Sequence, residues 1–106
     1  MAITVNLRYR GANARAFAEE MIASGTVDLI RKEEGNLRYE YYTSFDDPET
    51  VLLIDSWTDQ AAIDAHHASP MMATIAALRE KYDLRMTVER YVSVEENDAD
   101  MKYIRK

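Results

Sequence analysis

Hydrophobic and polar side chains alternate through residues 2–9, which places Ile3, Val5, Leu7 and Tyr9 on one face of an extended chain. This period of two is typical of a half-buried β-strand. Apolar residues then recur at spacings of three and four through residues 14–33, and that spacing predicts a helix. Ser24 and Gly25 interrupt the helical pattern, so we expect a kink or an irregular turn there.

The same two periods continue along the rest of the chain. Alternation predicts strands over 37–45 and 84–94, and the nearly continuous apolar run at Val51 to Ile54 predicts a buried strand over 50–57. The two strands on either side of Asp46–Pro48 therefore form a hairpin. Thr58 or Asp59 can cap a short helix that ends at His67, and Ser69 followed by Pro70 marks the start of a second helix.

The predicted order is strand, helix, strand, strand, helix, strand. This is the ferredoxin-like β-α-β-β-α-β plan, an α+β fold with an antiparallel sheet and helices on one face. Several strands carry apolar or aromatic residues on both faces, and packing two such sheets together would give a homodimer. We expect one domain over 1–106, with a core at about 2–94 and a tail at 95–106. Alternating Met101, Tyr103 and Ile104 could add a short strand to a neighbour.

Composition narrows the classes of function. The net charge is −6 and no basic cluster is visible, which argues against nucleic acid as a partner. The chain has no cysteine, and therefore no disulfide framework and no thiolate for catalysis or metal binding. It contains neither a signal peptide pattern nor an apolar run long enough to cross a membrane, so we expect a cytoplasmic protein.

Three segments carry a resemblance to a known family: EEGNLRYEYY at 33–42, LLIDSW at 52–57 and DQAAIDAHHASPMM at 59–72. They resemble the antibiotic biosynthesis monooxygenase superfamily. The most specific part is an acidic residue and a tryptophan on the third strand, a histidine on the next helix, and then Ser-Pro. In this chain those residues are Asp55, Trp57, His66, Ser69 and Pro70.

The resemblance implies a dimeric α+β barrel with a pocket between sheet and helices in each subunit. It also implies oxidation of a small quinol-like or polyphenolic molecule by dioxygen with no cofactor or metal. A haem-degrading activity is not implied, because Ala76 and Ala77 stand where those members carry a haem-ligating histidine. The two histidines of this chain are adjacent, which is poor spacing for a metal pair on a helix.

His66 is the leading candidate for the catalytic group, because imidazole can act as a base or hydrogen-bond partner near neutral pH. It could equally cap its helix or tie the helix to the sheet. His67 should point about 100° away from His66, so we expect it in solvent. Asp55 lies on the same face as Trp57 and, if buried, needs a partner such as His66 or Arg8.

Other residues are candidates to line the pocket. Asn6 matches a polar residue that reaches the pocket in relatives, so we expect a catalytic role for it, and Arg8 shares its face of the strand. Trp57 could form a wall of the pocket, although large aromatic residues more often belong to a core. Phe17, Tyr41 and Met71 complete the predicted substrate-binding set, and Met72 is a further candidate at the pocket mouth.

Three functions remain open at this point. The first is a cofactor-independent monooxygenase that uses His66 as its acid–base group. The second is an isomerase or lyase in which the same histidine moves protons without oxygen. The third is a dimer that binds a small molecule or a partner protein without catalysis. A well-formed pocket that contains His66 would count against the third function, and a pocket filled by Phe17, Met21 and Trp57 would favour it.

Overall fold

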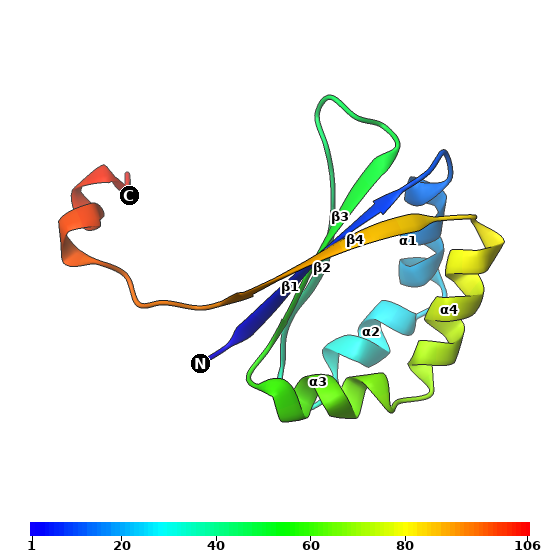
Figure 1. Ribbon diagram of the computed structural model, residues 1–106, viewed down its shortest axis with the longest axis horizontal. Coiled ribbons are helices and arrows are strands. Elements are labelled where there is room, and N and C mark those ends of the chain that lie inside the picture. The colour runs from blue at the N-terminus through cyan, green and yellow to red at the C-terminus, as the bar shows by residue number, and fades with distance from the viewer.

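All four α-helices lie on one face of a four-stranded antiparallel sheet (Figure 1). The computed structural model describes residues 1–106. The strands are β1 (Ile3–Arg10), β2 (Asn36–Thr43), β3 (Thr50–Trp57) and β4 (Arg85–Val92). Each lies within two residues of its predicted bounds, β1, β2 and β4 from alternation and β3 from its continuous apolar run.

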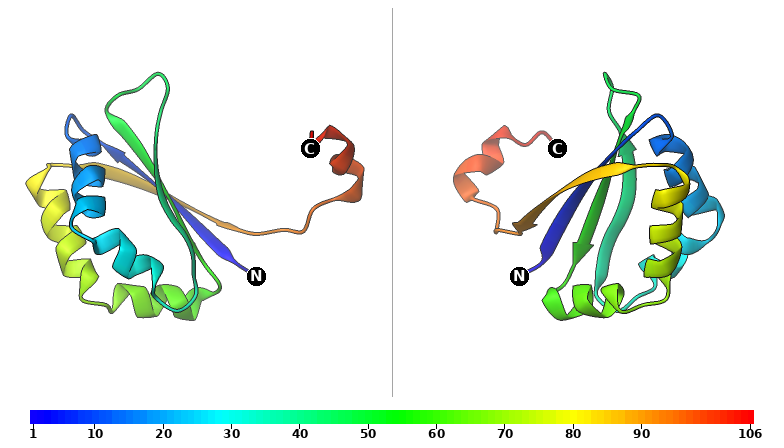
Figure 2. Two further views of the ribbon diagram at one scale, coloured as in Figure 1. Left: turned by 180° about the vertical axis from the view of Figure 1, so that it is seen from behind. Right: turned by 45° about the vertical axis from the view of Figure 1, so that its right-hand side comes forward.

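The helices form the second layer, as the two further views show (Figure 2). They are α1 (Ala14–Ala23), α2 (Thr26–Arg31), α3 (Gln60–His67) and α4 (Met71–Lys81). Helix α3 begins at an N-cap, Asp59, whose carboxylate accepts a hydrogen bond from the backbone N–H of Ala62 at 2.9 Å. The capping role predicted for Asp59 is therefore confirmed.

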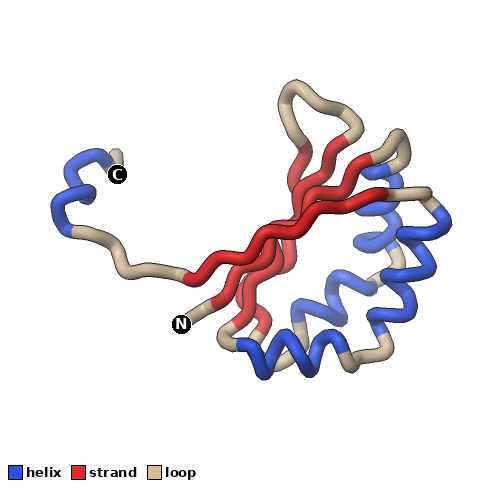
Figure 3. Tube along the Cα trace, viewed as in Figure 1, coloured by secondary structure: helices blue, strands red, loops and turns tan.

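The sheet order is β2-β3-β1-β4, and every neighbouring pair is antiparallel. β3 joins β2 through the predicted hairpin and also lies beside β1, so β1 and β2 run parallel with β3 between them (Figure 3). This arrangement confirms the ferredoxin-like α+β fold. β3 is therefore an interior strand, with β2 on one side and β1 on the other.

The predicted helix over 14–33 is divided into α1 and α2. Gly25 separates them and adopts a left-handed conformation at φ 82°, which glycine reaches without steric cost. Gly35 lies before β2 at φ 86°, and a Cβ there would stand 2.6 Å from the Cβ of Ala62 on α3. Glycine at position 35 thus lets the chain leaving α2 pass close to α3, which carries His66.

The core lies between the helices and the inner face of the sheet. Its largest fully buried side chains include Trp57, Tyr9, Phe17 and Met21. Phe17 on α1 packs against Tyr9 on β1, with ring centroids 4.9 Å apart. Burial of this aromatic group anchors α1 on the sheet.

The outer face of the sheet carries no helix (Figures 1 and 2). Strand alternation puts Leu52 and Ile54 of β3 on this face, and both are half-buried. Thr4 and Ser56 share the same face, where their hydroxyl oxygens lie 2.6 Å apart. The apolar run of β3 thus places Val51 and Leu53 in the core and its remaining residues on the open face.

The C-terminal tail extends away from the sheet beyond β4 (Figure 1). Residues Asp98–Tyr103 form a 3-10 helix, so the prediction of a short strand at Met101 and Tyr103 is wrong. The side chain of Asn97 accepts a hydrogen bond from the backbone N–H of Ala99 at 2.9 Å. This capped turn competes with an extended conformation, a common effect of asparagine side chains.

Candidate active site

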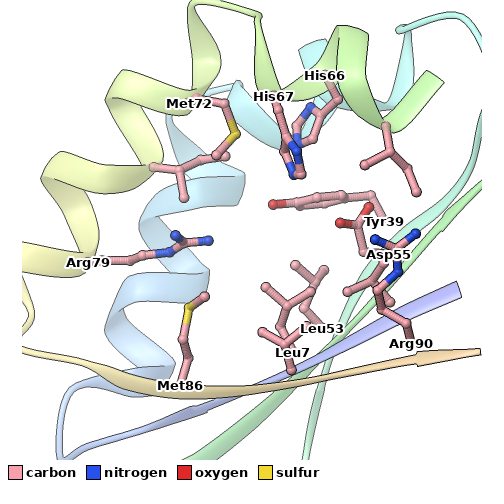
Figure 4. A pocket seen from close by; sticks show the side chains of 14 residues that line it. Leu7, Tyr39, Leu53, Asp55, His66, His67, Met72, Arg79, Met86 and Arg90 are labelled. Carbon is pink, nitrogen blue, oxygen red and sulfur yellow. The ribbon is translucent and has the colours of Figure 1, made fainter. Parts of the chain in front are cut away.

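A cavity of about 270 Å³ lies between the inner face of the sheet and helices α3 and α4. Fourteen residues line it and nine of these are hydrophobic, among them Leu7 of β1 and Leu53 of β3 (Figure 4). The five other lining residues are Asp55, His66, His67, Arg79 and Arg90, and Tyr39, which is one of the nine, adds a phenol hydroxyl. An apolar cavity with a few polar groups is the usual form of a small-molecule site.

His66 lies in the last turn of α3 and is buried at 4% exposure. Its Nδ1 is 2.7 Å from Oε2 of Glu33, which follows α2. A carboxylate can only accept a hydrogen bond, so Nδ1 carries the proton and Nε2 keeps its lone pair. Nε2 makes no hydrogen bond within the protein, and the imidazole lines the cavity.

Burial lowers the pKa of His66, because a buried imidazolium loses hydration. The hydrogen bond from Nδ1 to Glu33 and the negative charge of Glu33 act in the opposite direction. Trp57 stacks on the imidazole with centroids 4.8 Å apart and planes at 29°. The neutral, oriented imidazole is therefore the favoured form near neutral pH.

Asp55 extends from β3 into the same cavity. Its Oδ1 accepts a hydrogen bond from Nε1 of Trp57 at 2.6 Å, while Oδ2 has no partner. Burial raises the pKa of Asp55 to about 6; the Trp57 bond lowers it, and the charge of Glu33 raises it further. The cavity therefore holds two groups, Asp55 and His66, that can accept a proton near neutral pH.

Tyr39 of β2 supplies a hydroxyl to the cavity, as Figure 4 shows. Burial raises the pKa of Tyr39 well above its usual range, so the phenol stays protonated and can donate a hydrogen bond. Across the cavity, the guanidinium of Arg79 extends from α4 (Figure 4). Arg90 of β4 also lines the cavity and donates a hydrogen bond to Gln60.

Asn6 and Arg8 do not reach this cavity. Their β1 neighbours Val5 and Leu7 line it, so alternation turns Asn6 and Arg8 to the outer face of the sheet. Arg8 there forms an ion pair with Glu89 of β4. The expectation that Asn6 and Arg8 line the pocket is therefore wrong for the single chain.

The aromatic residues and Met71, which were predicted to line the pocket, also lie in different places from those expected. Trp57 lies behind His66 and Asp55, in contact with both, and is 1% exposed. Phe17 is wholly buried in the core, and Tyr41 borders a second, more open cavity near α1. Met72, which lines the main cavity, takes the place predicted for Met71, which packs against the core.

Two further expectations change. Asp55 binds Trp57 rather than His66 or Arg8, since Trp57 lies two residues along the same strand face. His67 is exposed as predicted, yet it also borders the cavity, with its ring 5.8 Å from that of His66. Adjacent residues can share a cavity here because α3 ends at its rim.

Sequence reasoning did not identify Glu33 or Arg79. Glu33 lies in the segment EEGN between α2 and β2, where an acidic pair looks like an ordinary solvated turn. Arg79 lies one position after the buried Leu78 on α4, and no motif singles it out.

No group of three or more histidine and carboxylate side chains is arranged to hold a metal ion. No helix has the length and hydropathy of a membrane span.

The fold has many relatives among solved structures. The cofactor-independent oxygenase SnoaB from Streptomyces nogalater superposes with a TM-score of 0.75 at 18% identity, over 92% of this chain and 97% of that chain. A conserved protein from Methanosarcina mazei Go1 gives 0.73 at 22% identity, over 86% and 91%. A protein from Mycobacterium tuberculosis gives 0.72 at 22% identity, over 91% and 98%. These likenesses show a shared fold.

Comparison with curated proteins gives no match. The family model described as antibiotic biosynthesis monooxygenase matches residues 1–78, which include β1 to β3, Glu33 and most of the cavity wall. The match takes in Asp55, Trp57 and His66 together. This chain belongs to the antibiotic biosynthesis monooxygenase family.

Proposed function

We propose that this protein is a cofactor-independent monooxygenase that oxidises a small quinol-like or polyphenolic molecule with dioxygen. The observation that carries the proposal is the neutral imidazole of His66, which Glu33 orients at the wall of an apolar cavity. Family membership and the shared fold of an oxygenase support the same class of reaction.

The protein's first task in this reaction is to remove a proton. His66 Nε2 accepts the hydroxyl proton of the substrate, and the charge of Glu33 stabilises the imidazolium that forms. The resulting phenolate is electron-rich enough to reduce dioxygen. Glu33 is thus a positioning residue, which fixes the tautomer of His66 and touches no substrate.

The substrate itself supplies the electrons. For a hydroquinone with a free ring carbon, one atom of dioxygen bonds to that carbon and the other leaves as water. The ring loses its two hydroxyl hydrogens and the displaced ring hydrogen; two of these three end in the water and one on the new hydroxyl, so the product is a hydroxyquinone. The protonated Tyr39 and the cationic Arg79 both line the cavity and can stabilise oxygen anions that form while the substrate reacts with dioxygen.

The competing functions make different demands on the same cavity. A cavity lined by His66 and not filled by Phe17, Met21 or Trp57 weakens the purely structural alternative. An isomerase or lyase would use His66 and Asp55 to move protons and would work without oxygen. Turnover under strictly anaerobic conditions therefore separates that function from the monooxygenase.

A homodimer is part of the proposal. The outer sheet face has half-buried Leu52 and Ile54 and exposed Tyr42 and Tyr91, and no helix covers it. Asn6 Oδ1 on this face is buried without a hydrogen-bond partner. Packing two such faces together would bury the apolar side chains and could bring a donor to Asn6.

Oxygen consumption tests the function. Purified protein, stripped of metal by chelation, should consume dioxygen with members of a panel of hydroquinones. His66→Gln should abolish most of this activity, because glutamine keeps a polar side chain but cannot take up the proton. Asp64→Asn is the control and should retain activity, because Asp64 is exposed on the same helix and does not line the cavity. A dimeric wild-type protein that consumes no oxygen with any member of the panel would contradict the proposal.

A further inference from the structure

We propose that Arg79 is the anion-binding subsite of this cavity, and that its ligand is a small aromatic molecule that carries a carboxylate. The ligand's aromatic hydroxyl, which would face His66, rests on the proposed function. The carboxylate is a separate claim and is argued from Arg79 itself. The two claims name different ends of the bound molecule.

The guanidinium of Arg79 has more donors than the protein satisfies. It offers five N–H groups, and its one hydrogen bond runs from Nη2 to the hydroxyl of Tyr9 at 2.9 Å. Its Nε is wholly buried and has no partner. Figure 4 shows the guanidinium directed into the cavity. Nη1 also makes no hydrogen bond and, unlike Nε, is not fully buried, so an oxygen of a ligand in the cavity can accept a hydrogen bond from it.

The charge of Arg79 is also uncompensated. No carboxylate oxygen lies within 4.0 Å of its guanidinium, and it is half-buried. The other arginines that form no ion pair are all exposed, namely Arg10, Arg15, Arg90 and Arg105. The contact of Arg79 is a tyrosine, whose ring also lies under the guanidinium at 5.5 Å. Burial raises the pKa of Tyr9, so that residue stays neutral. A half-buried cation that forms no ion pair favours an anionic ligand.

A carboxylate fits this site better than a second hydroxyl does. Its two oxygens match the planar fork of a guanidinium and form charge-assisted bonds, which are the strongest hydrogen bonds that proteins make with ligands. The protein as a whole is acidic, with net charge −6, so general attraction for anions does not account for binding. Leu7 and Leu53, on the sheet side of the cavity, leave an apolar surface for an aromatic ring.

The test compares two ligands of the same shape. We would measure binding of 2,5-dihydroxybenzoate and of its neutral amide, 2,5-dihydroxybenzamide, without oxygen and at constant ionic strength. Trp57 is the single tryptophan and stacks on His66, so its fluorescence reports occupancy of the cavity. We expect the carboxylate to bind about 10- to 100-fold more tightly than the amide.

Variants of Arg79 show whether this residue causes the preference for the carboxylate over the amide. Arg79→Met keeps an unbranched stem of similar thickness and removes the guanidinium, and it should reduce the preference to about unity. Arg79→Lys keeps the charge without the fork and should retain only part of it. Arg85→Met is the matched control: Arg85 is 81% exposed, lies outside the cavity, and its loss should leave both affinities unchanged.

The outcomes keep this inference separate from the proposed function. Equal affinities in the wild-type protein, or no binding of either ligand at millimolar concentration, would overturn the anion subsite. So would a carboxylate preference that survives in Arg79→Met. A carboxylate preference that requires Arg79, found in a protein that consumes no oxygen, would uphold the subsite and contradict the monooxygenase.

Discussion

Glu33 and His66 are 33 positions apart in the chain, and their Oε2 and Nδ1 atoms lie 2.7 Å apart. The contact joins the turn after α2 to the last turn of α3. Gly35 permits it, since its missing Cβ lets that turn approach Ala62 of α3. The pair determines which nitrogen of His66 is free to take a proton in the cavity.

Replacing Glu33 with glutamine tests this relationship. The amide oxygen can still accept the Nδ1 hydrogen bond, but the negative charge is lost. Because that charge raises the pKa of His66, the pKa should fall further below its usual value in Glu33→Gln. The acid limb of the kcat/KM profile should move to lower pH, with a matching shift in an NMR titration of the imidazole.

Glu34→Gln is the control for this variant, because Glu34 is the exposed neighbour in the same turn. It should leave the titration of His66 unchanged. An unaltered titration in Glu33→Gln, together with an unaltered profile, would remove Glu33 from the account.

Asp55→Asn should stabilise the protein at neutral and alkaline pH. Burial raises the pKa of Asp55 to about 6, so the folded state holds its proton more tightly than the unfolded chain. Wild-type stability from this group is therefore present below about pH 4 and is lost as pH rises through about 6. The asparagine variant should gain about 1–3 kcal/mol near pH 8.

Urea unfolding at several pH values measures the effect. The gain in stability of Asp55→Asn should shrink towards zero at about pH 4, where Asp55 is protonated in both the folded and the unfolded state. Asp100→Asn, in the exposed 3-10 helix of the tail, is the control and should show no such gain. If Asp55→Asn is less stable than wild type at about pH 8, contacts other than the Trp57 hydrogen bond must stabilise the charged carboxylate of Asp55.

Trp57→Phe should raise the pKa of Asp55 above about 6. The Nε1 hydrogen of Trp57 binds Oδ1 of Asp55 at 2.6 Å and stabilises the charged carboxylate, whereas phenylalanine has no donor. The smaller ring should still stack on His66. Carboxylate titration by NMR or infrared spectroscopy measures the shift, and a lowered pKa would contradict the role given to this bond.

Ile54→Lys should convert a dimer into monomers. Ile54 is half-buried on the outer face of β3, where a partner's sheet would meet it and a buried ammonium would be costly. Sedimentation of the wild-type protein should give a dimer. Leu29→Lys is the control, because Leu29 is 54% exposed on α2, away from that face. A wild-type monomer at micromolar concentration would contradict the dimer.

The fold could be predicted almost entirely from sequence, because its signals are local. Alternation, with the apolar run of β3, fixed the strands to within two residues, and Ser24–Gly25 marked the break between α1 and α2. The tail could not be predicted in the same way. Its alternating apolar residues resemble a strand, but no neighbouring strand satisfies the backbone there, and the side chain of Asn97 caps a 3-10 turn instead.

The site could be predicted only in part. Asp55, Trp57 and His66 were found because they lie in one motif, and they do meet in space. Alternation along β1 itself places Asn6 on the opposite face from Val5, which lines the cavity. Glu33 and Arg79 reach the site through contacts across the fold, and no sequence spacing encodes such contacts.

Labelled dioxygen gives the most direct test of the account. The purified, metal-free protein would be supplied with a reactive hydroquinone under isotopically labelled dioxygen, and the product analysed by mass spectrometry. We expect one labelled oxygen atom in the hydroxyquinone product from the wild-type protein, and loss of most of that product with His66→Gln. A product formed without label, or at the same rate without oxygen or without His66, would contradict the account.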